Sequence, residues 1–241
     1  QAAYWSIAWV SVAVMFGGGL WFYLQQTVGV GIANQKTMEY FAGYLLEKSL
    51  AIDNVFVWLM IFAAFAIPPA FQRKILLYGV LGAIILRTIF IFIGAWFVQE
   101  FSWVLYIFGA FLVYTGFKFL KGQDEEDTNI EDIKLLKWLR KHMRITPQLH
   151  GNNFFVRQNG VLWATPLFLV LILVEASDVI FAVDSIPAIF AVTSDPFIVL
   201  TANLMAILGL RAMFFLLAGA ASKMHYLPYG LGIILLFIGA K

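Results

Sequence analysis

The 241 residues are 62% hydrophobic and only 12% charged, against about 25% charged in an ordinary soluble domain. Several apolar stretches reach the ~20 residues needed to cross the hydrocarbon core of a bilayer, which predicts a polytopic helical membrane protein. The net charge of +2 indicates no partner by itself, and the lack of cysteine excludes disulfides and thiolate metal ligands.

Apolar runs with polar flanks predict seven membrane spans. A polar loop is expected at residues 25–36, between the first and second spans, and Pro68-Pro69 is expected to end the second span. In chain order, the spans are predicted at residues 4–24, 38–66, 75–98, 101–120, 162–192, 196–221 and 226–240.

Residues 118–157 differ in composition, because they hold eight of the 16 Lys and Arg residues and six of the 14 acids. Within this segment, apolar residues at helical spacing predict an amphipathic helix over residues 130–143, outside the membrane. The basic bias places the loop in the cytoplasm. The acidic run at residues 124–127 favours a solvated linker over a nucleic-acid site, so we expect no nucleic-acid partner.

Five acids lie deep inside predicted spans, where a charge costs roughly 2.5–3.5 kcal/mol on insertion scales. Several negative charges at this depth can be tolerated only if the carboxylates face one another across water or a cation, which predicts a cation site. The alternative is that the carboxylates are protonated or pack against an arginine. The only arginines deep in spans, Arg87 and Arg211, are predicted counter-ions that each approach an intramembrane carboxylate. The five acids are Glu47, Asp53, Glu175, Asp178 and Asp184.

The two halves of the chain resemble each other at three places in the same order. The stretch EKSLAIDN at residues 47–54 aligns with DVIFAVDS at 178–185, and LGAIILR at 81–87 aligns with MAILGLR at 205–211. A shared Tyr, two Gly and a Lys then recur at constant spacing in residues 106–118 and 229–241. Three spans per repeat predict two inverted repeats, as in many secondary transporters with a mid-membrane site. We therefore expect an all-α polytopic membrane protein, in which an N-terminal transmembrane helix and a cytoplasmic amphipathic helix accompany the two repeats.

Acids six residues apart on a regular helix point about 120° away from each other, so an unbroken helix cannot aim all of them at one point. Pro187 is predicted to break its helix and free carbonyls beside Asp184 and Ser185, although a simple kink is the alternative. Asn54 is the corresponding polar residue in the first repeat.

Oxygen ligands of this kind suit hard divalent cations such as Mg²⁺, Ca²⁺ and Mn²⁺. The three histidines, His142, His150 and His225, lie outside the predicted spans or at their ends. This placement argues against a histidine-rich zinc or copper site.

The motifs EKSLAIDN and VEASDVIFAVDSIPAIFAVT closely resemble those of the TerC membrane-protein family, particularly its Alx-type members. The resemblance covers nearly the whole chain. It implies an inner-membrane, multi-pass protein of the lysine-exporter superfamily type, associated with Mn²⁺ efflux and, in some members, with alkaline pH or tellurite response. It also implies further spans before residue 1 and after residue 241. The residues that match the family's motif positions are Glu47, Asp53, Asn54, Glu175, Asp178, Asp184 and Ser185.

We therefore expect a membrane transporter that exports Mn²⁺ as its substrate, with Ca²⁺ or Mg²⁺ as alternative ions, and whose transport is coupled to protons or to the membrane potential. Its partners are this cation and membrane lipids. The alternative is a metal-binding membrane subunit that assists metallation or assembly of exported proteins. An intramembrane metalloprotease would need a motif such as H-E-x-x-H, which the sequence lacks, so no enzyme is expected. The expected divisions are a first helix and loop (1–36), repeat 1 (37–120), the cytoplasmic loop (121–160) and repeat 2 (161–241).

Overall fold

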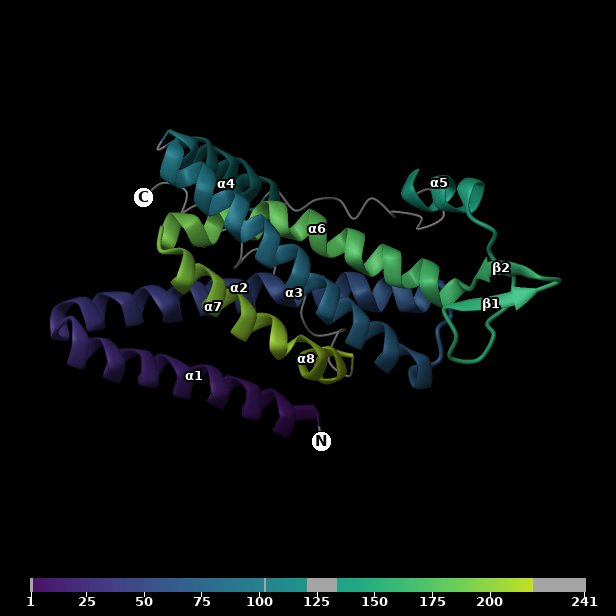
Figure 1. Ribbon diagram of the computed structural model, residues 1–241, viewed down its shortest axis with the longest axis horizontal. Coiled ribbons are helices and arrows are strands. Elements are labelled where there is room, and N and C mark those ends of the chain that lie inside the picture. The colour runs from purple at the N-terminus through teal and green to yellow at the C-terminus, as the bar shows by residue number, and fades with distance from the viewer. Residues whose placement is uncertain (1, 102, 121–133, 219–241) are drawn as a thin grey trace.

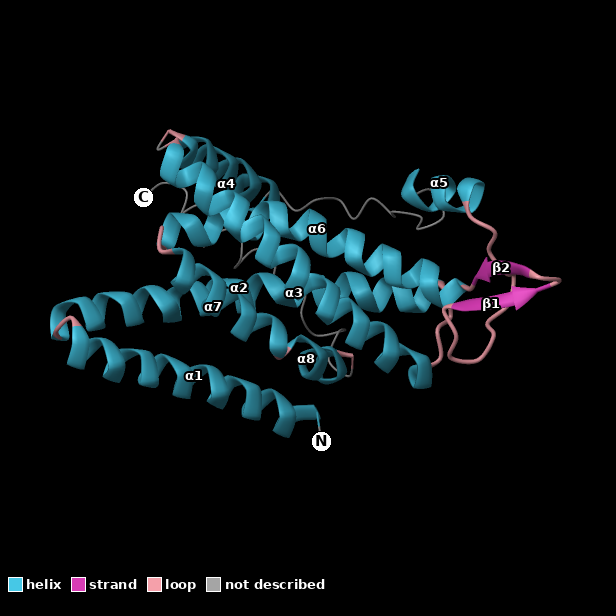
Figure 2. Cartoon of the chain, in the orientation of Figure 1, coloured by secondary structure: helices cyan, strands magenta, loops and turns pink. Residues whose placement is uncertain are grey.

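The computed structural model describes residues 2–101, 103–120 and 134–218, and Asp53 is described by its backbone alone. Over these residues the chain forms helices and one β-hairpin (Figures 1 and 2). The helices are α1 (Ala2–Thr27), α2 (Val30–Ala64), α3 (Pro69–Glu100), α4 (Val104–Leu120), α5 (Lys134–His142), α6 (Pro166–Val192), α7 (Pro196–Leu208) and α8 (Leu210–Leu217), and the strands are β1 (Phe155–Gln158) and β2 (Val161–Ala164).

The central helix of the bundle is α2, which contacts α1, α6, α7 and α8. Helix α3 packs along α6 and α7, and α4 packs on α6 (Figure 1). By length and apolar composition α1, α3 and α6 can each cross a membrane, and the α7–α8 pair, bent by 41°, would form a fourth span. The helices confirm the predicted all-α polytopic membrane architecture, to which the structure adds only the small hairpin.

Proline begins three of the long helices. Pro69, Pro166 and Pro196 occupy the first turn of α3, α6 and α7, where the missing N–H costs nothing because no intrahelical acceptor exists there. The predicted polar loop at residues 25–36 is wrong, because α1 runs to Thr27 and α2 begins at Val30. Gly29, with φ of +98°, makes the tight turn between them.

The hairpin lies at one end of the bundle, where the fifth span was expected to begin. Strands β1 and β2 pair antiparallel through Asn159-Gly160, both with positive φ; this dipeptide favours a two-residue hairpin turn. Residues 162–164 are therefore in a strand, and the helix starts only at Pro166.

The predicted break at Pro187 is also wrong, since α6 continues through this residue to Val192. The break in the second half lies instead at Gly209, between α7 and α8.

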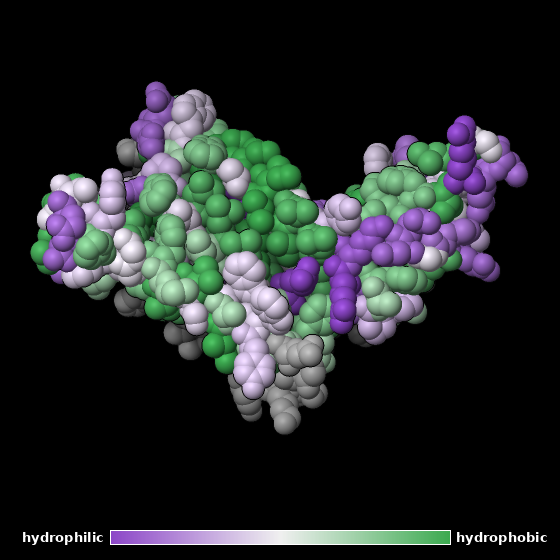
Figure 3. Space-filling view, turned by 60° about the horizontal axis from the view of Figure 1, so that its bottom comes forward, coloured by the Kyte–Doolittle hydropathy of each residue, from purple (hydrophilic) through white to green (hydrophobic). Residues whose placement is uncertain are grey.

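The amphipathic helix is present as α5, whose Leu136 and Leu139 are buried in the same core cluster as residues of α2 and α6. In Figure 3, hydrophobic residues cover the middle of the visible face, while hydrophilic residues gather toward its two ends. The seventh predicted span and the third repeat match at residues 229–241 lie outside the described residues.

Candidate functional site

The candidate site lies where α2, α3 and α6 meet, and residues that align between the two predicted repeats form it. Glu47 and Asn54 on α2, and Asp178 and Ser185 on α6, are all about 99% buried. The two residues of each pair are seven positions apart, so they point within about 20° of each other on a helix. The spacing that matters is therefore seven residues. It separates the first acid of each motif from the amide or hydroxyl residue that follows the second acid.

Arg87 of α3 lies between the two helices and joins them. Its Nη1 is 2.7 Å from Glu47 Oε2, and its Nη2 and Nε donate to the two oxygens of Asp178 at 2.9 and 3.2 Å. Nη1 also lies 3.5 Å from Ser185 Oγ, and Asn54 Nδ2 donates to Asp178 Oδ1 at 3.3 Å. One guanidinium thus joins α2 to α6, with a bidentate contact to Asp178.

The predicted role of Arg87 as a counter-ion agrees with this geometry. Its side chain is only 3% exposed, and those of Glu47 and Asp178 are 1% and 2% exposed. A buried ion pair is costly to break, because removal of one partner leaves a charge that is neither solvated nor paired. Two carboxylates share one guanidinium, so this buried set carries a formal charge of −1.

Three buried side-chain oxygens on α2 and α6 have no hydrogen-bond partner in the described part of the chain. They are Glu47 Oε1, Asn54 Oδ1 and Glu175 Oε2. Buried polar atoms are nearly always hydrogen-bonded, so these partnerless oxygens need an explanation. Carboxylate and amide oxygens are the ligand types that hard divalent cations take.

Glu175 reaches toward α3 because a glycine makes room for it. A Cβ atom on Gly82 would collide with the Glu175 carboxyl group. Glu175 itself is half-buried, one turn before Asp178 on α6. Gly82 was not singled out from sequence, and only its position in the aligned LGAIILR stretch could have drawn attention to it.

The structure does not bring all seven predicted ligands together. Within the described residues, no group of three or more His, Cys, Asp or Glu side chains is placed to hold a metal ion. Asp184 is half-buried on α6 and makes contacts of its own, whereas the Asp53 side chain lies outside the described atoms. Glu47 and Asp178 are joined through Arg87 in this state.

The prediction for Arg211 is corrected by the structure. Its side chain is exposed on α8, and over the described residues it pairs with no carboxylate. The helix bends at Gly209, just before Arg211, whereas α3 runs unbroken through Arg87. The arginines at 87 and 211 are thus equivalent in sequence but not in environment.

Lys48 directly follows Glu47 on α2, and sequence analysis assigned it no role. In the structure Lys48 Nζ donates to the carbonyl of Ala206 at 3.3 Å, beside the α7–α8 bend. The buried polar side chains of Tyr44 on α2 and Asn203 on α7 were not singled out from sequence.

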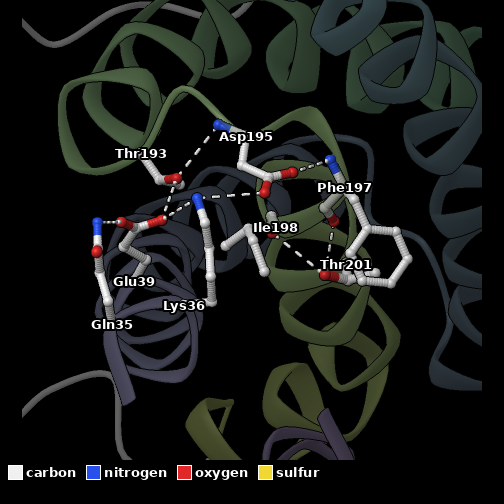
Figure 4. Close-up of polar contacts among 8 residues, drawn as sticks. All are labelled: Gln35, Lys36, Glu39, Thr193, Asp195, Phe197, Ile198 and Thr201. Carbon is white, nitrogen blue, oxygen red and sulfur yellow. Dashed lines mark hydrogen bonds and ion pairs between the residues drawn. The ribbon is translucent and has the colours of Figure 1, made fainter. Parts of the chain in front are cut away.

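A second charged cluster ties α2 to α7 at the end of the bundle opposite the hairpin (Figures 1 and 4). Lys36 Nζ lies 3.0 Å from Glu39 Oε2 and 3.3 Å from Asp195 Oδ2. Thr193 donates to Glu39 at 2.6 Å, and Asp195 Oδ1 accepts from the Phe197 N–H, which caps α7. Burial lowers the pKa of Lys36, but hydrogen bonds to both acids raise it, with a net upward shift.

Known proteins resemble this chain over its whole length. The family model described as "Integral membrane protein TerC family" matches residues 32–241. A Photorhabdus laumondii protein named "Putative membrane-bound redox modulator Alx" is 63% identical over all 241 residues, which cover 75% of that protein. A protein of the same name from Escherichia coli K12 is 60% identical with the same coverage. An uncharacterized membrane protein from Myxococcus xanthus is 47% identical over the whole chain and 73% of that protein. No solved structure matches.

Proposed function

Because this chain belongs to the TerC family of integral membrane proteins, we propose that it exports divalent metal cations, with Mn²⁺ as the favoured substrate. The observation that carries the proposal is the buried centre in which Glu47 and Asp178, from the two repeats, meet at Arg87. Carboxylates deep inside membrane helices usually mark ion pathways.

The charge at this centre favours a cation. Glu47 and Asp178 outnumber Arg87 by one, and the half-buried acids Glu175 and Asp184 add to the negative charge on α6. Oxygen donors alone, without thiolate or intramembrane imidazole, suit Mn²⁺, Mg²⁺ or Ca²⁺ better than zinc or copper. The partnerless oxygens of Glu47, Asn54 and Glu175 supply such donors.

Arg87 gives the centre a resting state without metal. Its guanidinium neutralises carboxylates that would otherwise stand unpaired in a buried site. In the proposed cycle, the divalent ion replaces Arg87 as the partner of at least one carboxylate, and the ion then leaves on the other side of the membrane. Carboxylates bind a cation only when they are deprotonated, so protons compete with Mn²⁺ and can drive its exchange.

We propose a transporter rather than an enzyme. On the positive-inside rule, we also propose that the basic loop lies on the cytoplasmic side of the inner membrane. The name of the Photorhabdus and Escherichia relatives refers to redox modulation. These 241 residues contain no cysteine, so thiol chemistry has no donor here. The competing hypothesis is a metal-binding subunit that metallates or assembles exported proteins, which would bind Mn²⁺ without carrying it across the bilayer.

Mn²⁺ uptake into inverted membrane vesicles separates these hypotheses. Asp53→Asn and Asp184→Asn keep side-chain volume but remove charge, and each should abolish uptake while the protein remains in the membrane. The matched control is Glu125→Gln in the loop, which should transport like wild type. Uptake should weaken as pH falls, because protons occupy the carboxylates. Full uptake by both intramembrane variants, or an equal loss in the loop variant, would show that the acids serve packing.

A further inference from the structure

Helices α2 and α7 lie side by side in parallel, and their contact contains the bend at Gly209. Three contacts fix the register. Lys36 meets Asp195 at one end (Figure 4), Gly43 lies against Ala202 in the middle, and Lys48 reaches Ala206 at the other end. Residue numbers rise together on both helices, so residues near 44 on α2 lie level with residues near 203 on α7.

The bend exposes a backbone acceptor inside the bundle. The last carbonyls of a helix have no intrahelical partner, and they carry the negative end of the helix dipole. The Ala206 carbonyl is one of them, since α7 ends at Leu208. In secondary transporters, carbonyls at such breaks coordinate monovalent cations. Here Lys48 Nζ takes that place, 3.3 Å from the Ala206 oxygen.

Gly209 leaves room for the ammonium group at the bend. A Cβ atom on Gly209 would lie 2.5 Å from Lys48 Nζ, so any larger residue would push the ammonium away. The backbone does not require glycine here, because φ of Gly209 is −83°. Over the described residues, no carboxylate forms an ion pair with Lys48. The hydrogen-bond partner of the ammonium is thus a backbone carbonyl rather than an acid.

Asn203 is the second observation that points to a ligand. It is completely buried, and neither its Oδ1 nor its Nδ2 has a partner in the described part of the chain. It lies three residues before Ala206, on the same face of α7. Tyr44, one turn before Lys48 on α2, also has a buried hydroxyl without a partner. Buried groups left unpaired in this way are rare unless an ion or water belongs among them.

We propose that the α7–α8 bend is a monovalent-cation site, built from the Ala206 carbonyl and the polar groups of α7 and α2, which the Lys48 ammonium fills. The site is separate from the Arg87 centre and is independent of the proposed metal export. An internal cation at this point fixes the bend permanently, so that the fold needs no bound alkali ion there.

Chemical rescue tests the proposal. Lys48→Ala removes the ammonium and leaves space for a small primary ammonium ion, so ethylammonium chloride is the probe. Thermal unfolding of the purified protein should show a melting temperature that rises by about 2–4 °C at a few times the dissociation constant. Wild type should not respond, and neither should Lys36→Ala, the matched control on the same helix. Tetramethylammonium chloride at equal ionic strength has no N–H donor and should have no effect.

A Lys48→Ala protein that folds but does not respond to ethylammonium would overturn the proposal. Should that variant fail to fold even with the probe, Asn203→Leu decides. If Asn203 helps to hold a cation, the variant should melt at a lower temperature than wild type. If the amide is merely unpaired, its replacement by leucine should leave the melting temperature equal or higher, and the proposal fails. None of these measurements uses a divalent ion, so they stand apart from the outcome for Mn²⁺ transport.

Discussion

Replacement of Arg87 by glutamine tests the buried centre most directly. The change removes three hydrogen bonds, of 2.7, 2.9 and 3.2 Å, from two carboxylates that are almost completely buried. Loss of one partner of a buried ion pair costs about 3–5 kcal/mol. At about 2–4 °C per kcal/mol for a chain of this size, we expect the melting temperature of Arg87→Gln to fall by about 6–20 °C.

The measurement is thermal unfolding in nanodiscs, followed by the fluorescence of the eight tryptophans. The control is Arg211→Gln, which should change stability by less than about 0.5 kcal/mol because its side chain is exposed. The double variant Arg87→Gln/Asp178→Asn should lose less stability than the sum of the losses in the two single variants. The second change removes the Asp178 charge that Arg87→Gln leaves without a partner. Added Mn²⁺ should raise the melting temperature of Arg87→Gln more than that of wild type. Equal melting temperatures for the two arginine variants would refute the assignment of Arg87.

Three further changes test separate features. Gly82→Ala should weaken Mn²⁺ transport while the protein stays folded, because the added methyl group displaces the Glu175 carboxyl; the apparent KM in vesicles reports this. Asp195→Ala removes the cap of α7 and should lower stability by about 1 kcal/mol, whereas Asp195→Asn should lose less, as thermal unfolding will show. Because the folded pKa of Lys36 is raised above its ordinary 10.5, its contribution to stability should be full at neutral pH and lost as pH rises through the folded value. The difference in melting temperature between wild type and Lys36→Met should therefore shrink only in strongly alkaline buffer.

The helical membrane architecture could be predicted because a long apolar run can adopt few structures other than a helix in a bilayer. The residues at which the helices begin and end could not be predicted. Residues 34–36 are polar yet helical, because their side chains find partners beside the bundle. Asn34 accepts from Trp21, and Lys36 pairs with Glu39. Polarity marks where a chain leaves the apolar core and does not mark where a helix stops.

The acids of the site could be predicted one by one, but their grouping could not. Glu47 and Asp178 come together only through α3, and the contact depends on how three helices are rotated and shifted against one another. Periodicity along one helix carries no such information. Arg211 was assigned to the buried set from its matched sequence context, yet the bend at Gly209 places it on the surface. Repeat symmetry in sequence thus does not guarantee symmetry of environment.

The shared arginine also bears on how the chain enters the bilayer during synthesis. Glu47 and Arg87 are 40 residues apart on α2 and α3, so both emerge from the ribosome well before Asp178, which follows Arg87 by 91 residues. A lone charge at the bilayer centre costs roughly 2.5–3.5 kcal/mol, and the early pair can offset it as soon as these two helices meet. Asp178 then arrives at a guanidinium that is already in place. The same contact that joins the two halves of the finished protein also makes the first half a template for insertion of the second.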